Sequence, residues 1–256
     1  MSGEKTVGDM QPEIRIVDDA AALAVAAAEE FVDAAGEAVA ARGRFTVALS
    51  GGSTPKQLYE RLASLGPSDT TIPWPQTHLF WGDERLVPPD HADSNYRMAR
   101  ETLLDRVALP AHQIHRIPTD TGDATEAASR YEAELRAFFS PAAGEVPRFD
   151  LILLGLGGDG HTASLFPGSG AVREEIRWVV GDRVEGTPYD RVTLTFPVLN
   201  NAARVIFLVR GSDKAIALQS VLEGDAPIDR IPARGVRPRS GRLLWLVDRD
   251  GAASLT

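Results

Sequence analysis

The chain has 256 residues, of which 43% are hydrophobic and 25% charged, and its formal net charge is −9. This composition is typical of a globular protein with a sizeable core, and the acidic balance argues against nucleic acid or an anionic membrane as the main partner. Cysteine is absent, which excludes disulfides and thiolate metal sites, and no apolar run reaches the length that spans a bilayer, so we expect a cytoplasmic protein.

The predicted elements alternate along the chain. After the polar segment 1–13, which predicts a flexible leader, the alanine-rich stretch 20–42 predicts a helix that is preceded by Asp18 and Asp19 and ended by Gly43. Further helices are predicted at 55–65, 95–105, 125–139 and 212–224. Apolar runs predict strands at 45–50, 78–85, 112–118, 149–157, 191–196, 204–211 and 242–248.

This alternation predicts the fold class. Strands that alternate with helices indicate a single α/β domain over 14–256, with a mostly parallel sheet flanked by helices on both faces, doubly wound and Rossmann-like. Right-handed crossovers bring the strand-to-helix loops to one edge of such a sheet, and ligands bind at the carboxyl ends of its strands. The candidate site therefore lies where four of the predicted strands end.

The first of these strand ends reads SGGST and leads into a helix. Ser53 or Thr54 can cap that helix, and Pro55 suits its first position. Free N–H groups at a helix start, with hydroxyls beside them, bind phosphate, although an ordinary capped turn has the same residues. The Walker pattern GxxxxGK[ST] is absent. The predicted phosphate ligands are Ser50, Gly51, Gly52, Ser53 and Thr54.

The second strand end carries charge directly after the apolar residues LFW. Asp83, Glu84 and Arg85 are costly at the end of a buried strand unless they face a ligand or pair with one another. A local ion pair at the surface is the ordinary alternative. Arg85 and Asp83 are the candidate site residues here.

The third strand end, LGLGGDGH, places a histidine behind a run of glycines. Of the five histidines, only His161 lies in a glycine-lined turn at a strand end, which predicts a general base; a purely structural histidine is the alternative. Asp159 can orient the ring or bind substrate hydroxyls, and Gly157 is a candidate substrate contact. The glycines also spell GxGxxG, but a dinucleotide site needs a long helix after the third glycine, and Pro167 follows too soon.

The fourth strand end reads VRGSDKA. With Ser212 as the N-cap, Lys214 falls in the first turn of a helix, where a cation opposes the helix dipole by a few tenths of a kcal/mol. A cation in this unfavourable position suggests a functional reason, and an anion bound there would be such a reason. A lysine that points to solvent is the alternative. Arg191, which opens a strand, is a second candidate for contact with an anion.

Together these stretches resemble the 6-phosphogluconolactonase family, in the superfamily that it shares with glucosamine-6-phosphate deaminase/isomerase. The resemblance covers about 45–253 and rests on ALSGGSTPKQLYERLA, LFWGDERLVPPDHADSNYRMARETLL, FDLILLGLGGDGHTASLFPGS, RVTLTFPVLNNAARVIFLVRGSDKA and LLWLVDRDGAA. The stretches GDGHTASLFPG and WGDER followed by SNY are specific. In the deaminase branch the histidine turn resembles GNDGHIAFNEP, and the aspartate strand resembles MDEY. At these two places this chain has HTASLFP and GDER, as the lactonases do.

The resemblance implies hydrolysis of 6-phospho-D-glucono-1,5-lactone to 6-phospho-D-gluconate in the oxidative pentose phosphate pathway. Residues 50–54, with Lys214 and Arg191, would hold the phosphate of this small sugar lactone. His161 would take a proton from the attacking water, and Arg85 would stabilise the oxyanion or hold the substrate. We predict no metal, no cofactor, and no nucleic-acid, membrane or protein partner.

Other chemistry is less favoured by the sequence. A covalent serine route lacks the GxSxG elbow, and Ser164, close to His161 in sequence, has no evident third partner. Two rival functions stay open: an amino-sugar-phosphate isomerase or deaminase, which would release ammonia from glucosamine 6-phosphate, and a non-catalytic sugar-phosphate-binding protein, which should have lost His161 or Asp159.

Overall fold

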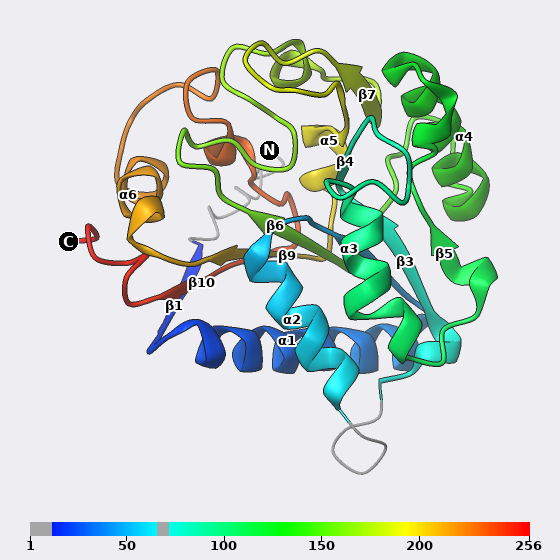
Figure 1. Cartoon of the computed structure of the whole chain (residues 1–256), viewed down its shortest axis with the longest axis horizontal. Helices are drawn as coiled ribbons and strands as arrows, with labels where there is room; N and C mark the ends of the chain where they lie inside the picture. The colour runs from blue at the N-terminus through cyan, green and yellow to red at the C-terminus, as the bar shows by residue number, and fades with distance from the viewer. Residues whose placement is uncertain (1–11, 66–71) are drawn as a thin grey trace, which may run out of the picture.

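The computed structural model describes residues 12–65 and 72–256, and two sheets organise this part of the chain (Figure 1). The main sheet is parallel, in the order β1-β10-β9-β6-β2-β3-β5, and the smaller one is antiparallel, in the order β4-β8-β7. The strands are β1 Glu13–Val17, β2 Phe45–Leu49, β3 Thr77–Trp81, β4 Asp83–Arg85, β5 Ile114–His115, β6 Leu151–Gly155, β7 Val179–Asp182, β8 Arg191–Leu194, β9 Arg204–Val209 and β10 Arg242–Asp248. The helices are α1 Ala20–Arg42, α2 Ser53–Ser64, α3 Asn95–Thr102, α4 Ala124–Phe139, α5 Phe196–Leu199 and α6 Ala215–Leu222.

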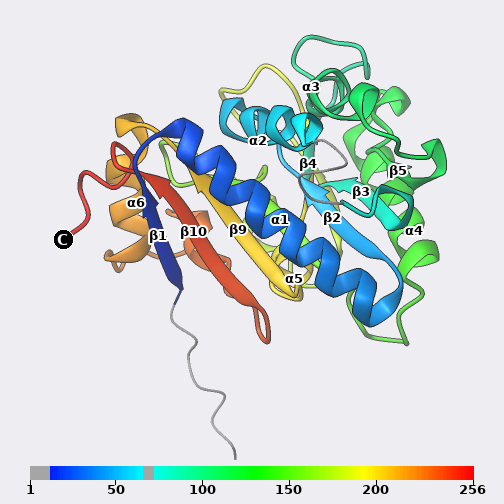
Figure 2. The same ribbon diagram turned by 90° about the horizontal axis from the view of Figure 1, so that it is seen from below.

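Helix α1 follows the sequence prediction at both ends. The carboxylate of Asp19 accepts a hydrogen bond from the N–H of Ala22 at 2.9 Å, and Gly43, in the left-handed region at φ 73°, ends the helix. Because most of its buried side chains are alanines, α1 lies close against the sheet, and Phe31 meets Phe45 of β2 edge-on at 5.2 Å. Figure 2 shows α1 and α2 on one face, and the small sheet and α5 lie over the other. The predicted α/β fold is confirmed.

The strand order creates a switch point at the middle of the main sheet. Strands β2 and β6 are neighbours, but the chain leaves β2 toward β3 on one side and leaves β6 toward β9 on the other. The loops that follow β2 and β6 therefore diverge, and open α/β sheets bind ligands at such a point. These two loops carry the motifs SGGST and GDGH.

The strand predicted at 78–85 is two strands, which is a correction. Gly82 separates β3, in the main sheet, from β4, in the small sheet. Its N–H donates to the carbonyl of Leu49 in β2 at 2.8 Å, and its own carbonyl accepts from the N–H of Leu194 in β8 at 2.8 Å. One residue thus joins the two sheets, and Asp83 and Arg85 lie on a strand of the small sheet.

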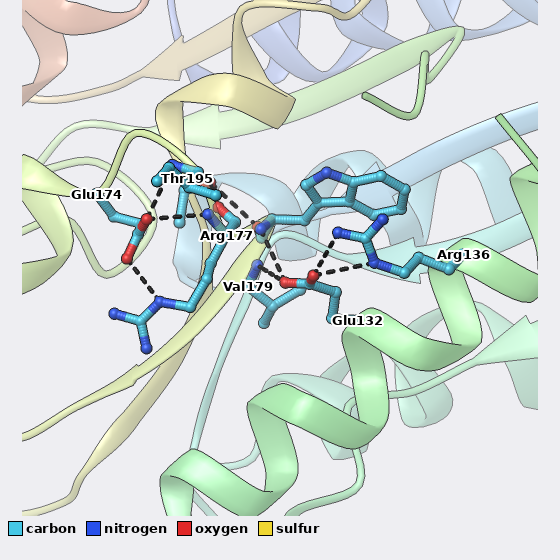
Figure 3. Close-up of polar contacts among 8 residues, drawn as sticks. Glu132, Arg136, Glu174, Arg177, Val179 and Thr195 are labelled. Atoms are coloured by element: carbon cyan, nitrogen blue, oxygen red, sulfur yellow. Dashed lines mark hydrogen bonds and ion pairs between the residues drawn. The ribbon is translucent and has the colours of Figure 1, made fainter. Parts of the chain in front are cut away.

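The small sheet is bound to α4 at the start of β7 (Figure 3). One carboxylate oxygen of Glu132 accepts hydrogen bonds from the N–H groups of Trp178 and Val179 at 2.8 and 3.2 Å, and the other accepts from Arg136 at 2.7 Å. The guanidinium of Arg136 covers the Trp178 ring at 3.8 Å. Strand β7 was not predicted, and the strand predicted at 191–196 belongs to this sheet as β8 instead of the main one.

Strand β10 has the predicted bounds, and the other predicted elements are found with shifted ends. The edge strand predicted at 112–118 is the two-residue β5, and the helix predicted to reach residue 105 ends at Thr102. Residues 1–11 of the leader predicted at 1–13 lie outside the described residues, and Glu13 begins β1, an edge strand that was not predicted. The single domain over 14–256 stays a prediction. In the described ranges, no helix is long and apolar enough to cross a membrane.

Candidate active site

The four predicted strand ends are joined to one another by short contacts. The side-chain amide of Asn95 donates to the backbone carbonyl of Asp83 at 3.0 Å, and its oxygen lies so near Gly51 that a Cβ there would approach it to 1.9 Å. The hydroxyl of Ser164 donates to the Asp83 carboxylate at 2.7 Å. A Cβ on Gly158 would contact the backbone of Asp213 at 3.9 Å. The loops after β2, β3, β6 and β9 therefore form one site.

His161 and Asp159 form the titratable pair of this site. Nδ1 of His161 lies 2.5 Å from Oδ1 of Asp159, which also accepts the backbone N–H of His161 at 3.1 Å. The hydrogen bond from His161 holds the pKa of the Asp159 carboxyl below its usual range, so Asp159 is ionised at neutral pH. The His161 side chain is 30% exposed. In the described residues no hydrogen bond engages its Nε2, which leaves that nitrogen available to a substrate or a water.

Glycines make room for this pair. A Cβ on Gly157 would lie 2.0 Å from Nδ1 of His161 and 2.6 Å from Oδ1 of Asp159. Gly157 is therefore next to the pair, and its predicted contact with substrate stays a prediction. Gly160 has φ 83° and lies against Ile231, and its carbonyl accepts the N–H of Ala233 at 2.9 Å. This support from the segment before β10 was not predicted, because nothing local in the sequence links it to the turn.

Phe166 connects the histidine to a buried arginine. Its ring stacks on the His161 imidazole at 4.2 Å with an interplanar angle of 28°. The guanidinium of Arg191 lies 5.9 Å from the centre of the same ring. Phe166 lies in the GDGHTASLFPG stretch, but the sequence alone gave it no role.

Arg85 and Arg191 form a second feature of the site, an arginine pair. They lie directly opposite each other in the antiparallel pairing of β4 with β8. Arg191 is 9% exposed, and the Nε atoms of both residues are buried with no hydrogen-bond partner in the part of the chain that the structure describes. Among the described residues neither arginine is in an ion pair, and Arg85 donates to the backbone carbonyl of Asp93 at 2.7 Å. Burial, and next the Arg85 charge, lower the pKa of Arg191. Two adjacent cations, of which Arg191 is buried and Arg85 half-buried, are suited to an anion through their unpaired Nε–H groups.

Asp83 and Glu84 are buried and hydrogen-bonded to neighbouring segments of the site, and the catalytic role predicted for Asp83 stays a prediction. Glu84 is 2% exposed, and its carboxylate accepts the N–H groups of Asn95 and Tyr96, each at 2.8 Å, at the start of α3. Burial raises the pKa of Glu84, against the effect of these hydrogen bonds. Asp83 is also buried, with Ser164 as its donor. Because Ser164 is 1% exposed and its hydroxyl donates a hydrogen bond to Asp83, it is poorly placed to act as a nucleophile.

The start of α2 differs from the predicted cap. Gly52, at φ 103°, is the N-cap, the helix begins at Ser53, and no side chain caps it. Ser53 and Thr54 are therefore the first helical residues, and the first N–H groups of a helix have no partner within it. Ser50 is buried with its hydroxyl unpaired, while its backbone is fixed by the hydroxyl of Tyr59. Residues 50–54 thus present donors without partners next to β6.

Lys214 lies at the N-terminal end of α6, as predicted, but Ser212 is not its cap. Gly211, at φ 93°, precedes a 3-10 turn at Ser212–Lys214, and α6 follows from Ala215. Nζ of Lys214 pairs with the exposed Asp213 at 3.0 Å. No three His, Cys, Asp or Glu residues in the described ranges are grouped as a metal site.

Comparison with known proteins gives the family of the chain and solved structures with the same fold. The model of the family described as glucosamine-6-phosphate isomerases/6-phosphogluconolactonase matches residues 18–245. The chain is 42% identical over 247 residues to the 6-phosphogluconolactonase of Nostoc sp., covering 96% of this chain and 100% of that protein. It is 47% identical over 219 residues to the 6-phosphogluconolactonase of Synechocystis sp., covering 86% and 88%. A solved structure, the 6-phosphogluconolactonase from Trypanosoma cruzi, has a TM-score of 0.85 at 31% identity and covers 97% of this chain and 99% of that one.

Proposed function

The chain belongs to the family of glucosamine-6-phosphate isomerases and 6-phosphogluconolactonases, and we propose that His161 is the general base with which it hydrolyses 6-phosphogluconolactone. The lactonase activity, a step of the pentose phosphate pathway, follows from relatives of that name at 42% and 47% identity over most of the chain. The observation that supports His161 as the base is its contact of 2.5 Å with the ionised Asp159 at the switch point of the sheet.

The Asp159 carboxylate directs the chemistry to one ring nitrogen. As a hydrogen-bond acceptor on Nδ1, it favours the tautomer in which Nδ1 carries the proton and Nε2 has the free lone pair. Nε2 then takes a proton from water as the water oxygen bonds to the lactone carbonyl carbon. The imidazolium that forms is stabilised by the adjacent carboxylate. When the bond from that carbon to the ring oxygen breaks, the same proton passes from Nε2 to the leaving oxygen.

The arginine pair supplies positive charge where the substrate carries or develops negative charge. We assign Arg85 to the oxyanion that forms on the carbonyl oxygen during attack. We assign Arg191 to the phosphate, because its desolvated guanidinium would gain charge-assisted hydrogen bonds from the phosphate oxygens. Both assignments are supported by the buried, unpaired Nε atoms.

The phosphate has further donors at the start of α2. Within residues 12–65 and 72–256, no hydrogen-bond partner competes with an anion for the N–H groups of Ser53 and Thr54 or for the hydroxyl of Ser50. Lys214 would exchange its exposed partner Asp213 for the phosphate. We propose that these groups bind the phosphate and that the lactone ring then lies next to His161.

The decisive experiment measures lactone hydrolysis above the spontaneous rate in His161→Ala. General-base catalysis contributes about 10²–10⁴-fold, so kcat should fall by about this factor. The fall corresponds to about 3–5 kcal/mol of lost transition-state stabilisation, and KM should change much less. His161→Gln should not restore the rate, because an amide cannot take the proton. His112→Ala, at an exposed histidine, is the matched control and should keep full activity.

The same preparation separates the rival interpretations. Near-wild-type turnover in a folded His161→Ala protein would refute the role of His161 as base. Release of ammonia from glucosamine 6-phosphate would indicate the isomerase branch of the family, and binding of 6-phosphogluconate without turnover would indicate a binding protein. A cytoplasmic location stays a proposal, supported by the absence of cysteine from the whole sequence, and cell fractionation tests it.

A further inference from the structure

The turn that follows His161 is held by two buried hydroxyl side chains. Thr162 and Ser164 are each 1% exposed. The hydroxyl of Thr162 donates to the carbonyl of Gly155, at the end of β6, at 2.9 Å. Ser164 reaches the small sheet instead: its hydroxyl donates to the Asp83 carboxylate at 2.7 Å, and its N–H donates to the hydroxyl of Thr193 at 3.2 Å.

Between these two anchors the backbone has an unfavourable conformation. Ala163 has φ 47°, in the left-handed region that residues with a Cβ rarely adopt. It is one of two such non-glycine residues in the described part of the chain, together with Ser140 at the end of α4. A conformation of this kind persists only where the surroundings determine it, and at Ala163 the surroundings are the bonds of its two neighbours.

The second anchor ties the histidine to the strands that carry the arginine pair. Asp83 lies on β4, two residues before Arg85, and Thr193 lies on β8, two residues after Arg191. Ser164 contacts both strands, three residues after His161 and two residues before the ring that stacks on the imidazole. A shift of Ser164 would therefore move the base relative to the cations.

We propose that Ser164 is a positioning residue, whose hydrogen bond to Asp83 fixes His161 at its working distance from Arg85 and Arg191. The inference rests on the proposed role of His161 as the base. Ser164 does not touch the reacting atoms in this proposal. A displacement of about 1 Å of a catalytic group can cost about 10²-fold in rate, so one buried hydrogen bond is sufficient for a large effect.

The test uses Ser164→Ala with Ser169→Ala as its matched control. Ser169 lies in the same loop, and its buried hydroxyl has no hydrogen-bond partner, so its removal should leave kcat unchanged. Ser164→Ala should lower kcat by about 10- to 100-fold, and KM should stay within about threefold because the phosphate contacts are unaltered. A kcat within twofold of wild type, or equal losses in kcat and 1/KM, would overturn the proposal.

A double-mutant cycle shows whether Ser164 acts through His161. In the His161→Ala background, Ser164→Ala should change the remaining rate less than about twofold, whereas independent effects would multiply. Multiplying effects overturn the proposal. Should Ser164→Ala not fold, Ser164→Cys keeps the size with a weaker donor and should lose kcat about three- to tenfold; full kcat in folded Ser164→Cys would also overturn it. Full activity in His161→Ala alone would instead refute the proposed base.

Discussion

Replacing Arg191 by Met should stabilise the unliganded protein and weaken its binding of phosphate. The substitution removes the charge and keeps most of the volume of the side chain. In the unliganded protein Arg191 is buried opposite Arg85, and its Nε has no partner. We therefore expect the pair to lower stability when no anion is bound, and the proposed contact of Arg191 with phosphate would offset this cost.

The magnitude follows from the cross-strand geometry. At a separation of about 5–7 Å and an effective dielectric of about 20, two unit charges repel by about 2–3 kcal/mol. The carboxylates of Asp83, Glu84 and Asp93 offset part of this repulsion. We therefore expect Arg191→Met to raise the free energy of unfolding by about 1–2 kcal/mol.

The assay is urea unfolding of wild type and variant, with and without inorganic phosphate. A ligand that binds only the folded state stabilises it by RT ln(1 + [L]/Kd), so phosphate should stabilise the wild type more than the variant. Arg183→Met is the matched control, because Arg183 is an exposed arginine close to the small sheet, paired with Asp190, and its loss should change stability by less than about 0.5 kcal/mol. If Arg191→Met is less stable than wild type, or if phosphate stabilises both proteins equally, the reasoning on the arginine pair is wrong.

Two further predictions concern stability. Glu132→Ala should lower the free energy of unfolding by about 2–3 kcal/mol in urea titration, because it leaves the N–H groups of Trp178 and Val179 without their acceptor. Burial, and next the His115 ring, lower the pKa of His78 to about 4. The protein should therefore become less stable as pH falls from about 6.5 to 4, because His78 takes up its proton in the unfolded chain before it does so in the folded one. The full shift would be worth about 3 kcal/mol, and partial exposure of His78 reduces the expected loss to about 1–2 kcal/mol, measured by unfolding at both pH values.

Each of these has a control in the same element or cluster. Glu126→Ala removes an exposed carboxylate of α4 that pairs with Arg130 and should cost less than about 0.5 kcal/mol. His78→Gln should reduce the loss of stability between pH 6.5 and 4. An unchanged pH dependence in His78→Gln, or a Glu132→Ala protein as stable as Glu126→Ala, would contradict the respective prediction.

The sequence by itself determined the fold class and most of the strand ends that build the site. The apolar run before Gly155 and the Asp19 cap of α1 are local signals, read from neighbours in the chain. His161 could be found in the same way, because a glycine-lined turn after a buried strand is a local pattern, and the resemblance to a family rests on such stretches. The glycines of that turn are needed because a Cβ at Gly157 would overlap the imidazole.

Tertiary structure alone decided how these parts meet. The sequence could not divide 78–85 at Gly82, since the division depends on hydrogen bonds to Leu49 and Leu194 from distant strands. Arg85 and Arg191 lie opposite each other because of the register in which β4 pairs with β8, two strands about a hundred residues apart in the chain. The bond from Ser164 to Asp83 likewise joins segments separated by 81 positions. Local patterns indicate that an element is present and roughly where it lies, whereas pairing between distant strands sets where some elements are divided and which charges become neighbours, and only the folded chain contains that information.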